Sequence, residues 1–258
     1  KLEEKAADLG WPESEIEAEK QRIAIKNLRG IDKDSFLSKV AKAYLAILGD
    51  GRGGIHCENS LESFHNWSAK TFEDIQPESF DVIVTNPPFG KKLSIDSTEI
   101  LELYDLGHRW NSVPGGVFEK GALADKQPPQ LLFIERCFQM LRPGGRMGIV
   151  LLESIFGMPK YQYVVNYIRL QAKINAIVTL PEDLFQPHTH AKCCVLICQK
   201  YKKNESYSSC DNYDIFMSDV KWCGHDSRGN ITYSYTSTGE KVVLDEIPLV
   251  ADRYLEMR

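Results

Sequence analysis

Residues 80–90 are Phe-Asp-Val-Ile-Val-Thr-Asn-Pro-Pro-Phe-Gly, an apolar run that stops at an asparagine followed by two prolines. Because proline has no backbone N–H to donate to a sheet, this pattern predicts a strand over 80–85 that ends at Asn86. With proline at about 5% of average composition, an Asn-Pro-Pro-aromatic string arises by chance in roughly a fraction of one per cent of such chains. A rigid turn explains the prolines but requires neither the asparagine nor the aromatic ring. The string therefore indicates a functional loop at a strand end.

Apolar runs and helical spacing of apolar residues alternate along the rest of the chain. Strands are expected at 23–31, 54–57, 80–85, 147–152, 174–180 and 193–198, and helices at 35–48, 130–141 and 161–171. This alternation predicts an α/β fold with a mostly parallel sheet and helices on both faces. Residues 90–127 have poor periodicity and predict a long loop or insertion, and the chain becomes polar and less regular beyond about Lys200.

Three polar residues follow expected strands. Asp32, Asn59 and Asn86 each stand at the carboxyl end of a strand, the end of a parallel sheet at which ligands bind. For Asp32 the competing interpretation is a helix N-cap, since a helix follows. For Asn59 it is a plain turn residue, which is equally well supported.

Composition limits the classes of function. The 258 residues are 43% hydrophobic and carry a formal net charge of -5. A protein that binds DNA unaided usually has a basic face, so this charge favours a separate DNA-reading subunit or domain. There are seven cysteines without a C-x-x-C pair, which favours free thiols over disulfides or a zinc ribbon. No apolar run is long enough to span a bilayer and no secretory signal pattern is present, so we expect a cytoplasmic protein.

The chemistry of the loop 86–89 follows from its residue types. The nitrogen of an exocyclic aromatic amine is a poor nucleophile because its lone pair is delocalised into the ring. The side-chain oxygen of Asn86 and the carbonyl oxygen of Pro87 can each accept one hydrogen of such an amine, which favours the pyramidal geometry that attacks a methyl group. Pro88 keeps the loop stiff, and the ring of Phe89 offers a face on which a flipped-out base stacks.

The chain resembles a known family along most of its length. The strings TNPPFG, QLLFIERCFQMLRPGGRMGIVL and INAIVTLPEDLF, together with LRGIDKDSFLSKVAKAYLAILGDG and IHCENSL, look like the N6-adenine methylase domain of type I restriction-modification methylation subunits. The resemblance covers roughly residues 25–230. It implies a class I, Rossmann-like methyltransferase fold that uses S-adenosylmethionine. It assigns Asp32 to the ribose hydroxyls of this cofactor and Asn59 to the surroundings of its adenine.

Two features depart from the family pattern. The family's Gly-rich cofactor loop follows a first strand, and neither is apparent here, so we expect this chain alone to bind the cofactor poorly and to show no methyltransferase activity. Gly49–Gly54 follows a helix and precedes a strand, and it is therefore interpreted as a connection. Val150–Ser154 also replaces the family's usual Val-Leu-Pro-x-Gly.

The resemblance implies site-specific methyl transfer to N6 of adenine in double-stranded DNA, within a restriction-modification system that has a specificity subunit and a restriction subunit. The expected domains are a methyltransferase domain over 1–200 and a polar extension over 201–258. Two alternatives remain open: methylation of RNA guanine N2 or protein glutamine, and a non-catalytic fragment without cofactor binding. Metal sites at His188-Thr189-His190 and Cys223-Gly224-His225 are not expected, while Lys91-Lys92 and His108-Arg109 are as well explained by a solvated loop as by phosphate contacts.

Overall fold

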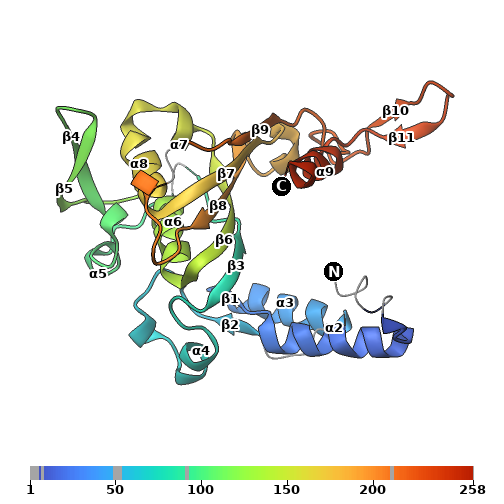
Figure 1. Ribbon diagram of the computed structural model, residues 1–258, viewed down its shortest axis with the longest axis horizontal. Coiled ribbons are helices and arrows are strands. Elements are labelled where there is room, and N and C mark those ends of the chain that lie inside the picture. The colour runs from blue at the N-terminus through green and yellow to red at the C-terminus, as the bar shows by residue number, and fades with distance from the viewer. Residues whose placement is uncertain (1–5, 7–8, 49–53, 91–92, 210–211, 258) are drawn as a thin grey trace. The chain divides into compact units, whose positions relative to one another are not determined.

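The computed structural model describes residues 6, 9–48, 54–90, 93–209 and 212–257. The chain divides into two compact units, residues 1–76 and 77–258 (Figure 1). This division differs from the domain limits expected from the sequence, which stay a prediction. No helix of the described residues is long and apolar enough to cross a membrane.

The first unit contains a short parallel sheet and its helices. Its elements are α2 (Glu13–Asn27), β1 (Gly30–Asp32), α3 (Ser35–Ile47), β2 (Ile55–Cys57), the 3-10 helix η1 (Phe64–Asn66) and α4 (Ala69–Asp74). β1 and β2 pair in parallel, with Asp32 opposite Cys57. The Asp34 carboxylate accepts hydrogen bonds from Phe36 N and Leu37 N, which begins α3 as an N-cap.

The expected strand over 23–31 was wrong for its first half. α2 continues to Asn27, and only Gly30–Asp32 is a strand. Glu, Ala, Lys, Gln and Arg dominate residues 13–27, and these strong helix formers outweigh three isoleucines. Ion pairs from Lys20 to Glu17 and from Arg22 to Glu19, one helical turn apart, add to the preference.

The second unit is built on a five-stranded sheet in the order β3-β6-β8-β7-β9. Its strands are β3 (Phe80–Thr85), β6 (Leu141–Leu152), β7 (Ala172–Thr179), β8 (Cys193–Lys200) and β9 (Phe216–Asp219). β3 pairs in parallel with β6 and β7 with β9, while β8 is antiparallel to both of its neighbours. Only β8 therefore opposes the common direction, which confirms the α/β class with a mostly parallel sheet.

Helices pack against this sheet. α6 (Pro129–Met140) and α8 (Gln162–Gln171) form the main core with one face, burying Leu131, Ile134 and Ile168 against residues such as Ile149 and Leu196. On the other face α9 (Ile247–Glu256) contacts β9 through Tyr254 and Phe216, whose ring centroids are 5.5 Å apart. Short elements complete the unit: α7 (Ser154–Gly157) and the 3-10 helices η3 (Pro159–Tyr161), η4 (Glu182–Phe185) and η5 (Tyr207–Ser209).

A lysine closes the end of α6. Lys200 Nζ donates to the carbonyl oxygens of Phe138 and Leu141 at 2.8 and 2.9 Å, and to Glu78 Oε1 at 2.8 Å. These carbonyls belong to the last turn of α6 and the first residue of β6, where helix carbonyls lose their partners. The side chain of Lys200 is 15% exposed, so the cation binds them in partial shelter from water.

The expected long loop over 90–127 was wrong in part, because it contains a β-hairpin. α5 (Thr98–Leu101) and the 3-10 helix η2 (Asp105–Gly107) lead into β4 (His108–Val113) and β5 (Val117–Leu123), which pair antiparallel. Gly115 and Gly116 make the turn with φ of 92° and 74°, values that glycine adopts without strain. Its strands lack strict apolar alternation because the hairpin is exposed on much of its surface.

The remaining expectations were close to the structure. The helices at 35–48, 130–141 and 161–171 and the strands at 54–57, 80–85, 174–180 and 193–198 are confirmed with small shifts of their ends. The strand expected at 147–152 begins earlier, at Leu141. The less regular region beyond Lys200 contains β9, which joins the main sheet, and the hairpin of β10 (Tyr233–Tyr235) and β11 (Lys241–Val243).

Each unit also exposes apolar surface. Val82 and Val84 of β3, which pairs with β6 alone among the described strands, are 50% and 80% exposed. On α3, Phe36 and Ile47 are 70% and 82% exposed. The expectation that the sheet lacks its first strand stays a prediction.

Candidate functional site

The Asn-Pro-Pro-Phe loop lies where the sequence placed it, directly after the edge strand β3. The last paired residue is Thr85, opposite Ile149 of β6. Pro87 is buried, while Asn86 and Pro88 are exposed. The buried proline anchors the loop in the protein while its two neighbours face solvent, so a ligand can reach the side chain of Asn86.

The Asn86 side chain is available for a ligand. No residue in the described part of the chain hydrogen-bonds to its amide. An exposed amide satisfied only by water can exchange that water for a ligand at small cost. This availability is what the proposed role of Asn86 requires.

Phe89 meets a second aromatic ring that the sequence reasoning missed. Phe185, the last residue of η4, packs edge to face on Phe89 with ring centroids 5.6 Å apart and an interplanar angle of 83°. Both rings are half-buried. Phe185 belongs to the string LPEDLF, which was used for the resemblance but not assigned a role, and only the folded chain brings it to Phe89.

Asp32 is not the cap of α3. Its Oδ1 accepts a hydrogen bond from Asp34 N at 2.8 Å, and Asp34 provides the cap instead. No described residue bonds to the second carboxylate oxygen of Asp32. A half-buried carboxylate at the end of β1, oriented through one oxygen and free at the other, fits a ligand that carries hydroxyl groups.

Asn59 fits the turn interpretation better. Its Oδ1 accepts from Leu61 N at 3.2 Å, its Nδ2 donates to Glu62 Oε1 at 3.1 Å, and its backbone oxygen accepts from Trp67 Nε1 at 3.0 Å. Both polar atoms of the side chain already hold a local turn. A cofactor contact by Asn59 would therefore use its remaining bonding capacity only.

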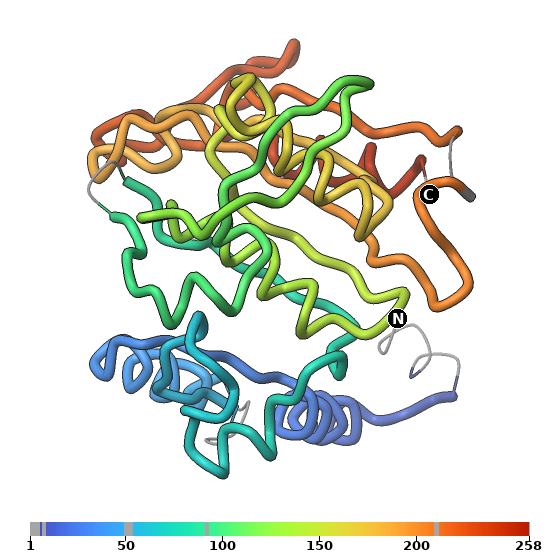
Figure 2. Tube along the Cα trace, turned by 90° about the vertical axis from the view of Figure 1, so that its left-hand side faces the viewer, coloured from blue at the N-terminus to red at the C-terminus, as the bar shows by residue number. Residues whose placement is uncertain are grey.

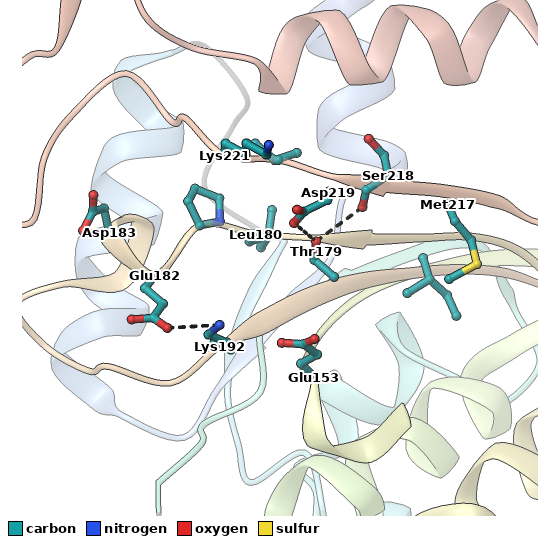
Figure 3. A pocket seen from close by; sticks show the side chains of 13 residues that line it. Glu153, Thr179, Leu180, Glu182, Asp183, Lys192, Met217, Ser218, Asp219 and Lys221 are labelled. Atoms are coloured by element: carbon teal, nitrogen blue, oxygen red, sulfur yellow. Dashed lines mark hydrogen bonds and ion pairs between the residues drawn. The ribbon is translucent and has the colours of Figure 1, made fainter. Parts of the chain in front are cut away.

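A cavity of the described structure lies apart from this loop. Its volume is about 750 Å³, and it opens at the carboxyl ends of β7 and β9 (Figure 3). Its walls carry four carboxylates, Glu153, Glu182, Asp183 and Asp219, and two lysines. None of residues 86–89 lines it. An excess of carboxylates repels phosphate, so this cavity is not where a nucleic-acid backbone would bind.

Several lining groups are already paired with one another. Lys192 Nζ lies 3.5 Å from Glu182 Oε1, and Thr179 donates to Asp219 Oδ1 at 2.5 Å (Figure 3). No group of three or more metal-ligating side chains occurs among the described residues. The interpretation of His188, His190, Cys223 and His225 as loop residues stays a prediction.

The cysteines in the sheet are unsuited to nucleophilic chemistry. Cys193 and Cys194 begin β8 and are buried, and burial raises the pKa of their thiols to about 11 and about 12. A thiol with such a pKa carries almost no thiolate near neutral pH. All cysteines in the described ranges are free.

Two pairs of basic residues are candidates for phosphate contacts, Lys91-Lys92 and His108-Arg109. Lys91 and Lys92 lie outside the described residues, as does most of Gly49–Gly54. Arg109 stands at the root of the β4–β5 hairpin, with Nη2 2.6 Å from Asp125 Oδ2. His108 Nδ1 lies 3.0 Å from the backbone oxygen of Tyr104, so its ring takes part in a local contact.

Comparison with known proteins finds a methylase subunit among the similar sequences. The type I restriction enzyme EcoEI methylase subunit of Escherichia coli is 25% identical over 189 residues, 66% of this chain and 34% of that subunit. The chain thus spans about a third of the length of this relative.

Solved structures share the fold. The type I restriction enzyme EcoKI M protein has a TM-score of 0.51 at 20% identity, with 89% of this chain and 42% of that one covered. The type ISP restriction-modification enzyme LlaGI, solved with a DNA substrate mimic, has a TM-score of 0.57 at 13% identity, with 97% and 24% covered. A family model described as N-6 DNA Methylase matches residues 12–230, and the chain belongs to this family.

Proposed function

We propose that the protein containing this chain transfers a methyl group from S-adenosylmethionine to N6 of adenine in double-stranded DNA. The observation that carries the proposal is the exposed amide of Asn86, which has no hydrogen bond from a described residue and lies in the same loop as Phe89, whose ring packs on Phe185. Membership of the N-6 DNA methylase family supports it.

The loop acts on the acceptor amine. The Asn86 side-chain oxygen and the Pro87 carbonyl accept the two amine hydrogens, which localises the nitrogen lone pair. These hydrogen bonds strengthen as positive charge develops on nitrogen, so they stabilise the transition state more than the ground state. The proton leaves to solvent after transfer, and no covalent enzyme intermediate is needed, in agreement with the raised pKa values of the buried thiols.

The two rings hold the base. An adenine that leaves the duplex loses its stacking, and an aromatic face replaces part of that loss. Phe89 supplies such a face, and Phe185, at right angles to it, limits where the base can lie. Together the rings position the amine against the methyl donor, which is a large part of the rate enhancement available to a reaction between two bound substrates.

The cofactor supplies an electrophilic methyl group on a sulfonium. Asp32 fits its ribose, because one carboxylate oxygen is oriented by Asp34 N and the other has no bond from a described residue. Asn59 contributes less, since its amide already holds a turn.

A multi-subunit context is part of the proposal. The net charge of -5 argues against unaided DNA binding, and the relatives named above are a methylase subunit and restriction-modification enzymes. We infer a specificity subunit as a partner and a restriction subunit in the same system.

Two other functions give different products. Methylation of RNA guanine N2 or of protein glutamine uses similar loops, and a non-catalytic protein would transfer nothing. The experiment is incubation of the full-length protein with labelled S-adenosylmethionine and DNA, RNA or protein acceptors, followed by identification of the labelled product. Label in N6-methyladenine supports the proposal, and label in another product or none contradicts it.

A further inference from the structure

A second, shallow cavity lies at the root of the β4–β5 hairpin. Its volume is about 300 Å³, and its lining includes Arg109, Trp110, Lys126, Gln127 and Tyr163. Trp110 of the hairpin and Tyr163 of α8 are stacked, with ring centroids 6.0 Å apart and planes 13° from parallel. Figures 1 and 2 show the hairpin next to α8. Because these stacked rings already cover one face of each other, a planar ligand would stack on the side of the pair that borders the cavity.

Hydrogen bonds to the neighbouring turn fix the orientation of Trp110. Trp110 Nε1 donates to the backbone oxygen of Asp105 at 3.2 Å. The backbone N–H groups of Asp105 and Leu106 donate to the two carboxylate oxygens of Glu135, each at 2.9 Å. Glu135 is 5% exposed, so a buried carboxylate on α6 fixes the turn that orients the indole.

The other ring is packed against the protein. Tyr163 of α8 is half-buried and packs against the main hydrophobic core, as Trp110 does. Gln127, which lines the same cavity, donates through Nε2 to the backbone oxygen of His108 at 3.2 Å. Because both rings are packed before any ligand arrives, stacking on them costs little side-chain entropy.

The cavity carries cations that a ligand can recruit. Lys126 is exposed and has no ion pair with any described residue. The Arg109–Asp125 pair has side chains 60% and 87% exposed, and such surface pairs contribute at most about 1 kcal/mol. An incoming phosphate can therefore compete for Arg109. An irregularity in the hairpin register at Arg109, where His108 pairs with Leu123 and Trp110 with Lys120, redirects side chains at this point.

We propose that this cavity is a nucleotide-binding site, separate from the loop 86–89, in which a base stacks on Trp110 and Tyr163 and its phosphate contacts Arg109 and Lys126. Stacking accepts any base, because every base has a π-face. The ligand chemistry is a nucleobase with an attached phosphate, taken from a DNA strand or from a free nucleotide. As a DNA contact the site rests on the proposed function, since it would hold a nucleotide away from the methylated adenine.

The test uses the full-length protein and two probes that contain no adenine. A fluorescein-labelled oligothymidylate is titrated by anisotropy, and thymidine monophosphate by equilibrium dialysis. Trp110→Ala is expected to weaken binding of the occupying probe by about 5- to 100-fold, and Trp110→Phe by less. For the oligonucleotide, Lys126→Ala is expected to reduce the slope of log affinity against log salt by about one. Tyr235→Ala and Lys202→Ala, which change an exposed aromatic ring and an exposed lysine elsewhere, leave binding unchanged.

The results of this test identify the source of the nucleotide, and they distinguish failure of the nucleotide site from failure of the proposed function. Tighter binding of the oligonucleotide assigns the site to DNA, and equal binding of the two probes assigns it to a free nucleotide. Unchanged affinity in both Trp110→Ala and Lys126→Ala, with unchanged melting, overturns the site. If Trp110→Ala does not fold, Trp110→Phe and Lys126→Ala decide. If the variants change the affinity for the probes but the protein transfers no methyl group, the proposed function is contradicted and the nucleotide site is supported. If the protein transfers methyl groups but its affinity for the probes is the same in all variants, only the proposed nucleotide site is ruled out.

Discussion

Phe185 lies edge to face against Phe89, 5.6 Å between ring centroids, although the two residues are in segments far apart in the sequence. One ring ends the Asn-Pro-Pro-Phe loop after β3 and the other ends η4 after β7. The contact gives the loop an aromatic neighbour on one side, while the amide of Asn86 remains exposed. A base held by the rings would therefore present its amine to a group that has no competing partner among the described residues.

Replacing Asn86 by Ala should abolish methyl transfer and leave the fold intact. The side chain is exposed and forms no hydrogen bond with a described residue, so its loss changes stability by about 0.5 kcal/mol or less. Transfer of labelled methyl groups to DNA is measured beside thermal melting, with Asn204→Ala, an exposed asparagine outside the site, as the control. Undiminished transfer in the Asn86 variant would show that the amide has no part in catalysis.

Replacing Phe89 by Ala should weaken binding of adenine-containing DNA by about 1 to 3 kcal/mol, while Phe89→Tyr and Phe89→Trp keep part of it. Stacking tolerates a different ring but not the absence of one. Binding is measured by anisotropy with melting as the control for folding. If all three variants bind equally well, Phe89 serves packing against Phe185 and not the base.

Variants of Asp32 and Asp34 should distinguish cofactor binding from helix capping. Asp34→Ala removes the cap of α3 and should cost about 1 kcal/mol of stability. Asp32→Ala should instead lower the affinity for S-adenosylmethionine more than it lowers stability, because the Asp32 carboxylate bonds only to Asp34 N among the described residues. Calorimetric titration and chemical denaturation of the full-length variants measure the two effects. Wild-type cofactor affinity in Asp32→Ala would assign this residue to the turn alone.

Lys200→Met should destabilise the second unit by about 2 kcal/mol. The change leaves the carbonyls of Phe138 and Leu141 without their donor and removes the ion pair to Glu78. A hydrogen bond to a charged group contributes about 1.5 to 3 kcal/mol net, and water can replace part of the loss at this partly exposed position. Lys202→Met, with a side chain 68% exposed, is the matched control. Denaturation midpoints that are the same for both variants would count against a capping role for Lys200.

Stability should decrease with acidification through His56. Burial lowers its pKa below the usual value of 6.5, an effect that nearby Asp74 opposes and Lys42, Arg29 and Lys70 reinforce. The unfolded state therefore binds the proton more readily. The contribution of this residue is complete above about pH 6.5 and is lost as the pH falls toward the lowered pKa. His56→Gln should flatten this part of the stability profile, and an unchanged profile would contradict the assignment.

The sequence predicted those parts of the site that depend on local pattern. Asn86, Pro87, Pro88 and Phe89 follow a strand because a run of β-formers meets two prolines, and that can be recognised without a structure. Local pattern could not show which of Asp32 and Asp34 caps α3, since both precede this helix. The distinction depends on which carboxylate reaches Phe36 N and Leu37 N.

The missed features depend on tertiary contacts. Phe185 and the Trp110–Tyr163 pair join segments whose proximity no local pattern encodes. The β4–β5 hairpin escaped because its strands carry polar residues on both faces, and its root is fixed by Glu135 on α6. β9 is short and joins the sheet only through β7, so its apolar signal is weak.

The identity of the methylated atom is the most direct test of the account. The full-length protein, with its inferred specificity subunit, is incubated with deuterium-labelled S-adenosylmethionine and unmethylated DNA, and the nucleosides are analysed by mass spectrometry. The account predicts label in N6-methyladenine with the wild-type protein and none with Asn86→Ala. Label in another base, in RNA or in protein, or N6-methyladenine formed equally well by Asn86→Ala, would contradict it.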